Sequence, residues 1–233
     1  MAKDVIIALD FPGREEALGF LGLFKQEKPY VKIGMELFYR EGPEMVREIT
    51  GRGHRVFLDL KLHDIPNTVA SATRALGRLE VDMINLHASG GIQMMKGAAE
   101  ALLALGPKRP LLIAVTVLTS LHQAALHQEL LIDRPLPETV LHYAKNAREA
   151  GLDGVVCSPL EADSVHQALG QDFLTVTPGI RFADGAKGDQ SRVTTPGEAR
   201  ALGSDYIVVG RPITRAEDPV AAYRRCVNDF VQP

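Results

Sequence analysis

The chain has 233 residues, a hydrophobic fraction of 45%, a charged fraction of 24% and a formal net charge of −3. This length is typical of one α/β domain, and the composition is that of a globular enzyme or binding protein. The absence of a Lys/Arg block argues against nucleic acid as a partner. Two cysteines form no disulfide framework, and neither a signal peptide nor a membrane-length apolar run is found. We therefore expect a cytoplasmic protein with no membrane partner.

Eight short apolar runs predict β-strands. They begin at Val5, Val31, Val56, Asp82, Leu111, Gly154, Phe173 and Tyr206. Each run is rich in β-branched residues and is followed by Gly, Pro or polar residues, which favours strand over helix. Their apolarity is continuous and not alternating, which indicates burial on both faces, as in a parallel sheet.

Segments with helical periodicity lie between these runs. Residues 14–26 place Ala17, Leu18, Leu21 and Phe24 on one side, and residues 138–151 repeat Val140, Leu141, Ala144 and Ala147 before Gly151. Eight β-then-α units predict a single (β/α)8 TIM barrel over residues 1–233. A doubly wound open sheet is the alternative, but the first turn, DFPGREE, lacks the GxGxxG pattern of that fold.

Two connections are longer than the others. Residues 119–137 must bridge the fifth strand and the next clear helix, so they form a lid or an extra helix. Residues 181–196 are rich in Gly, Asp and Lys without an apolar stripe, which predicts a mobile surface loop. Long polar loops after barrel strands are common locations for functional sites.

Polar residues stand at nearly every predicted strand end, where barrel enzymes place their chemistry. They are Asp10 after strand one, Lys32 in strand two, Asp59 and Lys61 in strand three, Thr119 at the end of strand five, Pro178 to Arg181 after strand seven, and Gly210 and Arg211 after strand eight. This distribution predicts a site at the carboxyl ends of the strands.

The segment DLKLHD places Asp59 and Lys61 two residues apart, so both side chains face the same side of a strand. If Leu60 and Leu62 face the helices, the charged pair faces the barrel axis. A salt bridge that fills a polar layer of the barrel is the alternative interpretation. Burying charges costs several kcal/mol each unless they are paired, so four charges at strand ends favour a functional role.

The segment VVGR at 208–211 suggests a phosphate-binding site. A glycine lets a backbone N–H approach an anion, and an arginine can donate two hydrogen bonds to it. A surface arginine is the alternative for Arg211 alone, but barrels commonly bind phosphate after strands seven and eight, where the segment TPGIR also lies.

No metal or cofactor motif is present: the chain has no HExxH, HxH or CxxC pattern. His63 and His87 have no partner at metal-ligand spacing, so we interpret both as hydrogen-bonding or packing residues. Cys157 follows two valines and has no evident base partner, which indicates a structural cysteine. We therefore expect neither a metal nor a cofactor.

These motifs, taken in order, resemble the orotidine 5′-phosphate decarboxylase family over essentially the whole chain. The resemblance rests on ALD at 8–10, DLKLHD at 59–64, LTS at 118–120, TPGIR at 177–181, DQ at 189–190 and VVGR at 208–211. The DxKxxD element also occurs in a wider superfamily of decarboxylases and aldolases, so the ordered set is the specific signal.

The resemblance implies a role for each matching residue. Asp59 and Lys61 would be the charged pair at the reacting carbon, with Lys61 the proton donor, while Asp10 and Lys32 would hold the ribose hydroxyls and the charge network. In a homodimer, Asp64 and Thr68 would enter the neighbouring subunit's site. Thr119 or Ser120 would contact the pyrimidine, and the remaining substrate-binding residues would be Pro178, Arg181, Gln190, Gly210 and Arg211.

The implied reaction is the decarboxylation of orotidine 5′-phosphate to UMP without a metal. Asp59 would either repel the substrate carboxylate or orient Lys61, and the sequence leaves both open. A magnesium-dependent decarboxylase of a phosphorylated sugar acid, such as 3-keto-L-gulonate 6-phosphate, is the closest enzyme alternative. A catalytically silent phosphate-binding barrel is the alternative from another class, although Asp59, Lys61 and Asp64 argue against it.

Overall fold

The computed structural model describes residues 3–183 and 193–231, and within these ranges eight parallel strands form a closed barrel. The strands are β1 (Asp4–Ala8), β2 (Tyr30–Gly34), β3 (Val56–Leu62), β4 (Met83–His87), β5 (Leu111–Val115), β6 (Gly154–Val156), β7 (Leu174–Thr177) and β8 (Tyr206–Val209). They pair in chain order, and β1 pairs with β8 to close the barrel. The predicted (β/α)8 barrel is confirmed.

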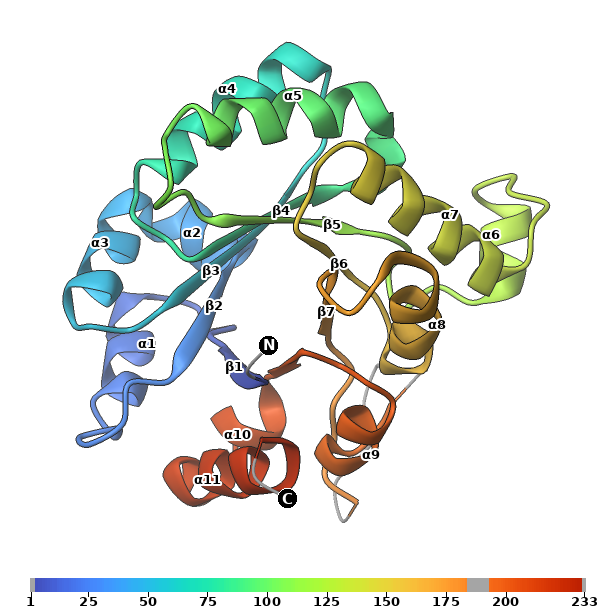
Figure 1. Ribbon diagram of the computed structural model, residues 1–233. Helices are drawn as coiled ribbons and strands as arrows, with labels where there is room; N and C mark the ends of the chain where they lie inside the picture. The colour runs from blue at the N-terminus through green and yellow to red at the C-terminus, as the bar shows by residue number, and fades with distance from the viewer. Residues whose placement is uncertain (1–2, 184–192, 232–233) are drawn as a thin grey trace.

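Helices surround the barrel and cover its outer face (Figure 1). They are α1 (Arg14–Leu21), α2 (Met35–Glu41), α3 (Pro43–Gly51), α4 (Pro66–Gly77), α5 (Gly91–Leu103), α6 (Gln123–Gln128), α7 (Leu136–Glu149), α8 (Pro159–Leu169), α9 (Pro196–Ala201), α10 (Arg211–Thr214) and α11 (Pro219–Phe230), with a 3-10 turn at Ala88–Gly90. Among the described residues, no helix is long and apolar enough to cross a bilayer.

Local sequence determines where several helices begin. Ser158 starts α8 with a capping box: its side chain accepts from the first turn, and Glu161 accepts from the Ser158 backbone N–H at 2.7 Å. Thr195 and Glu198 form the same arrangement at α9. Because these motifs satisfy N–H groups that have no partner inside the helix, they fix the helix starts.

The strands bury two apolar faces, as their continuous apolarity predicts. Alternate residues of each strand point to the barrel interior, where Ile6, Ala8, Tyr30, Phe57, Met83, Ile113, Leu174, Val176, Tyr206 and Val208 form one cluster. The residues between them pack against the helices in a second, larger cluster. Leu58 and Leu60 belong to this outer cluster and Leu62 packs against it, so Asp59 and Lys61 face the barrel axis.

The structure corrects two predicted boundaries. The fifth strand ends at Val115 and not at Thr119, so Thr119 lies in the following loop. Helix α1 ends at Leu21, followed by Gly22, which is a poor helix former. Phe24 is nevertheless buried, because two 3-10-type hydrogen bonds turn the chain back onto the core. The connection after β5 contains the short helix α6.

Candidate active site

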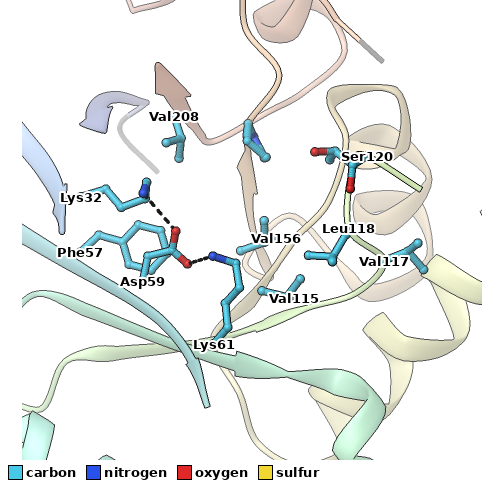
Figure 2. Close-up of a pocket in the computed structure, with 12 residues that line it drawn as sticks. Lys32, Phe57, Asp59, Lys61, Val115, Val117, Leu118, Ser120, Val156 and Val208 are labelled. Atoms are coloured by element: carbon cyan, nitrogen blue, oxygen red, sulfur yellow. Dashed lines mark hydrogen bonds and ion pairs between the residues drawn. The ribbon is translucent and has the colours of Figure 1, made fainter. Parts of the chain in front are cut away.

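A cavity of about 260 Å³ opens at the carboxyl ends of the strands (Figure 2). Its lining residues are Lys32, Phe57, Asp59, Lys61, Val115, Val117, Leu118, Thr119, Ser120, Val156, Pro178 and Val208. Besides Asp59, five of the predicted site residues therefore line this cavity. One wall of the cavity is charged and the other is apolar, which suits a flat ring that bears a charged substituent.

The charged wall is a chain of alternating charges. Lys61 Nζ lies 2.7 Å from Asp59 Oδ1, and Lys32 Nζ lies 3.2 Å from Asp59 Oδ2. Lys32 Nζ also donates to Asp10 Oδ1 at 3.1 Å. The Lys32 and Asp59 side chains are buried, whereas Asp10 is mostly exposed. Each buried charge therefore contacts at least one opposite charge, as burial of ions requires.

This pairing keeps the buried groups ionised. Burial alone would raise the pKa of Asp59, but the Lys32 and Lys61 ammonium groups outweigh it and lower that pKa below its ordinary value. Burial alone would lower the pKa of Lys32, but Asp59 and Asp10 outweigh it and raise that pKa. The site therefore presents fixed charges at neutral pH.

The backbone of β3 is irregular at Lys61. Its φ is 51°, in the left-handed region that a non-glycine residue adopts at a cost of about 1–2 kcal/mol. The pairing of β3 with β4 shifts register between Leu58 and Leu62. The Lys61 N–H donates to the Asn85 side-chain oxygen at 2.8 Å. This bulge departs from the regular strand that the alternation predicts.

Two residues of the site escaped the sequence analysis. Asn85, in β4, donates from its amide to Asp59 Oδ1 at 2.6 Å, and its one sequence signal is a polar residue inside an apolar run. Gly34 ends β2, and a Cβ there would lie 3.2 Å from Lys32 Nζ and 3.6 Å from Asp10 Oδ1. A side chain at position 34 would thus crowd this ion pair.

A second cavity, of about 340 Å³, adjoins the first and shares Lys32, Pro178 and Val208 with it. The rest of its lining is Ala8, Asp10, Gly179, Arg181, Gly210, Arg211, Thr214 and Arg215. Arg181 and Arg211 line this same cavity, and burial with the positive charge of Arg211 lowers the pKa of Arg181 from its ordinary value. Three arginines around one cavity suit an anion such as phosphate.

Two predicted residues line neither cavity, and a third is outside the described residues. Asp64 and Thr68 are exposed at the start of α4 and line neither cavity of the described chain. Asp64 instead accepts from the Ile65 N–H at 2.6 Å. Gln190 lies outside the described residues, together with most of the predicted loop at 181–196.

The two histidines near the cavity pack against each other. The rings of His63 and His87 have centroids 5.6 Å apart, which agrees with their interpretation as packing residues. Burial, with His63 and Lys61 nearby, lowers the pKa of His87. Within residues 3–183 and 193–231, no group of three or more His, Cys, Asp or Glu side chains is arranged to hold a metal ion.

Comparisons with known proteins agree with one another. Residues 3–226 match the model of the family described as orotidine 5′-phosphate decarboxylase / HUMPS. The orotidine 5′-phosphate decarboxylases of Bacillus cereus strain B4264 and Bacillus cytotoxicus are each 54% identical over 227 residues, which covers 96% of this chain and 95% of theirs.

Solved structures are similar over the same length. The crystal structure of orotidine 5′-phosphate decarboxylase from Lactobacillus acidophilus has a TM-score of 0.88 at 44% identity and covers 98% of this chain and 99% of its own. An uncharacterized conserved protein from Geobacillus kaustophilus has a TM-score of 0.87 at 50% identity, with coverage of 97% and 99%.

Proposed function

The chain belongs to the orotidine 5′-phosphate decarboxylase / HUMPS family, and we propose that it decarboxylates orotidine 5′-phosphate to UMP in the cytoplasm, in pyrimidine biosynthesis. The observation that best supports this reaction is the Lys61 ammonium group. Lys61 Nζ lies 2.7 Å from the buried Asp59 carboxylate, beside the apolar wall of the first cavity. The cluster of arginines lines the adjoining cavity. This arrangement fits a substrate with a phosphate at one end and a carboxylated ring at the other.

The chemistry requires fixed charge. When the bond between C6 and the carboxylate breaks, the electron pair stays on C6 in an orbital that the ring cannot delocalise. Lys61 stabilises this carbanion through its charge and then donates a proton from Nζ to C6, while CO₂ leaves. The resulting amine regains a proton from water.

Asp59 orients the proton donor. Its Oδ1 accepts from Lys61 Nζ and its Oδ2 contacts Lys32, so the carboxylate is held between two cations. The 2.7 Å contact with Lys61 supports an orienting role, which is one of the two roles that the sequence left open.

The remaining cavity residues bind the rest of the substrate. Arg181, Gly210 and Arg211, which line the second cavity, bind the phosphate together with Gln190, and Pro178 lines both cavities. Asp10 and Lys32 bind the ribose hydroxyls, and Thr119 or Ser120 contacts the pyrimidine edge. Phosphate binding is remote from C6, so its binding energy is available to assemble the charged site.

We further propose that the enzyme is a homodimer in which Asp64 and Thr68 enter the partner's site. Both residues are exposed and lie outside the cavities of their own chain. Exposed apolar side chains occur next to Asp64, at Ile65, and directly after β2, at Met35. Exposed apolar side chains beside the proposed shared residue suit a surface that the partner covers.

Mixed dimers test this arrangement. Asp64→Ala and Lys61→Ala are each expected to be inactive, but a heterodimer of the two has one site with both residues intact. Activity should therefore return when the two variants are unfolded and refolded together, and sedimentation should show a dimer. A mixture that stays inactive while dimeric would contradict the shared site.

The function is tested by following the orotate absorbance band when the purified protein meets orotidine 5′-phosphate, with and without EDTA. We expect loss of the band at equal rates in both samples. An unchanged band, or activity only toward a phosphorylated sugar acid in the presence of Mg²⁺, would contradict the proposal and favour the superfamily alternative.

A further inference from the structure

Asn85 is a buried amide inside the barrel. It lies in β4 between the apolar residues Ile84 and Leu86, which face the helices, and its side chain points inward with 0% exposure. A buried amide costs several kcal/mol if its hydrogen-bonding groups have no partner. The two partners that Asn85 has are both parts of the charged wall.

The direction of these two hydrogen bonds is fixed by chemistry. The Lys61 backbone N–H can only donate, so it faces the Asn85 carbonyl oxygen at 2.8 Å. An ionised Asp59 can only accept, so it faces the Asn85 NH₂ group at 2.6 Å. The amide therefore has a single orientation that satisfies both neighbours.

Both bonds act on the geometry of the proposed proton donor. The first holds the Lys61 backbone where its φ is 51°, in the bulge of β3. The second fixes Asp59 Oδ1, the same oxygen that accepts from Lys61 Nζ at 2.7 Å. Asn85 thus connects two groups to β4. They are the backbone of Lys61 and the Asp59 carboxylate that accepts from the Lys61 ammonium group.

We propose that Asn85 is a positioning residue for the decarboxylation, and this inference rests on the proposed function. Asn85 is not among the residues that line the cavity of the described chain, so we assign it no contact with substrate. Its role is to hold Asp59 and Lys61 in the arrangement that directs the Lys61 ammonium group toward the reacting carbon. Misplacement of a catalytic group by about 1 Å can lower the rate on the order of 10²-fold.

The first test removes both hydrogen bonds with Asn85→Leu, which has a similar volume. We expect kcat to fall about 10- to 100-fold with little change in the affinity for UMP, because Asn85 acts on the transition state through Lys61. Equal loss of UMP affinity and of kcat would indicate general damage to the fold and would contradict a positioning role.

The second test uses Asn85→Asp, which should give a pH signature that a merely structural residue would not. A carboxylate at position 85 can accept from the Lys61 N–H. Its second oxygen would lie about 2.6 Å from Asp59 Oδ1, where the Asn85 NH₂ group now lies. Two carboxylates this close share a proton, and the protonated pair restores the donor to Asp59. The ratio of variant to wild-type kcat should therefore rise as the pH falls from 8 toward 5.

Stability provides a readout that does not depend on the reaction. The shared proton raises a carboxyl pKa in the folded Asn85→Asp variant, so the folded state binds more protons than the unfolded one, and stability increases as the pH falls. We expect the guanidinium midpoint of this variant to rise from pH 8 to pH 5 relative to that of Asn228→Asp. Asn228 is exposed on α11 and serves as the matched control.

The two readouts separate the two hypotheses. Wild-type protein that fails to decarboxylate orotidine 5′-phosphate would refute the proposed function, while a rising midpoint would still support the contact between positions 85 and 59. If Asn85→Asp follows the wild-type pH profile and the control midpoints, and Asn85→Leu keeps full kcat, the inference about Asn85 is overturned.

Discussion

Asp59 and Asp205 are both carboxylates buried at the barrel, with side chains 11% and 12% exposed, yet they belong to two different kinds of region. Asp59 lies near the carboxyl end of β3 and lines a cavity between two lysines. Asp205 immediately precedes β8, at the opposite end of the strand from Gly210 and Arg211. Burial alone therefore does not distinguish a site from a structural network.

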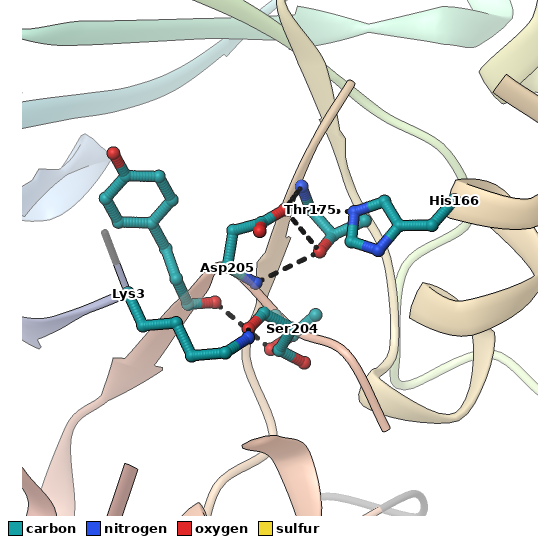
Figure 3. A network of polar contacts seen from close by, with 7 residues as sticks. Lys3, His166, Thr175, Ser204 and Asp205 are labelled. Carbon is teal, nitrogen blue, oxygen red and sulfur yellow. Dashed lines mark hydrogen bonds and ion pairs between the residues drawn. The ribbon is translucent and has the colours of Figure 1, made fainter. Parts of the chain in front are cut away.

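Asp205 lies in a network of hydrogen bonds with residues of neighbouring elements (Figure 3). Its Oδ2 accepts from the Thr175 N–H at 2.9 Å and the Thr175 hydroxyl at 3.1 Å, and it lies 3.0 Å from His166 Nε2. The Asp205 N–H in turn donates to the Thr175 hydroxyl at 3.2 Å. Lys3 donates to the carbonyl of the preceding Ser204. These contacts connect β7, β8, α8 and the N-terminus, so the role of Asp205 is structural.

The differences between the two regions are the useful signals for function. Around Asp59 there are two ammonium groups, an open cavity and a residue with a left-handed backbone. Around Asp205 the polar groups face each other and the strand is regular. Strain and charge beside a cavity persist only when the surrounding structure enforces them, which is typical of active sites.

The largest expected effect is that of Lys61→Ala. Because this variant removes both the stabilising charge and the proton donor, kcat should fall by about 10⁴-fold or more. The affinity for UMP, measured by calorimetry, and the free energy of unfolding should change little. Lys145→Ala, on the exposed side of α7, is the control. Appreciable residual turnover would remove Lys61 as the acid.

Asp205→Ala should lower the stability and leave kcat unchanged, which is the reverse of the result expected for Lys61→Ala. The Thr175 N–H and His166 lose their buried partner, so the free energy of unfolding should fall by about 2–5 kcal/mol, measured with guanidinium. The kcat of the protein that remains folded should match that of the wild type. Asp163→Ala on α8 is the control, since that carboxylate is exposed and bonds only to Gln167 among the described residues. A loss of kcat without a loss of stability would contradict a purely structural role for Asp205.

Arg211→Ala should have a smaller effect, confined to binding. Losing a charged hydrogen bond costs about 1.5–3 kcal/mol, which corresponds to a loss in UMP affinity of about 10- to 150-fold. Uridine, which lacks the phosphate, should bind the variant and the wild type equally. Equal losses for both ligands would show that Arg211 does not act on the phosphate.

The sequence predicts the barrel and most of the charged wall, because both follow from local patterns. Continuous β-branched runs predict the strands, and the two-residue spacing of Asp59 and Lys61 predicts that they face inward. Asn85 could not be assigned, because its partners depend on the register of β3 against β4, which includes a bulge. The pairing of Asp205 with His166, 39 residues apart, likewise follows only from how α8 packs.

The smallest effect is expected at the first residues of β2 and β8, where Tyr30 and Tyr206 face the barrel interior. The Tyr30 hydroxyl is buried and has no hydrogen-bond partner within the described residues, although its ring packs under Arg55 at 4.1 Å. Burial raises the pKa of Tyr30 well above its ordinary value, so the hydroxyl stays neutral. The Tyr206 ring lies 6.2 Å from that of Tyr30, and its hydroxyl, in contrast, is not among the buried polar atoms of the described residues that have no partner.

Tyr30→Phe should therefore raise the free energy of unfolding by up to about 1 kcal/mol, since it removes an unsatisfied polar group and keeps the ring. Tyr206→Phe, the matched variant, should not raise it, because the Tyr206 hydroxyl is not a buried polar group without a partner. Both should keep the wild-type kcat, since neither residue lines either cavity of the proposed site in the described chain. Equal changes in the two unfolding curves would mean that the Tyr30 hydroxyl has a partner after all, and the floor of the barrel would then resemble the Asp205 network.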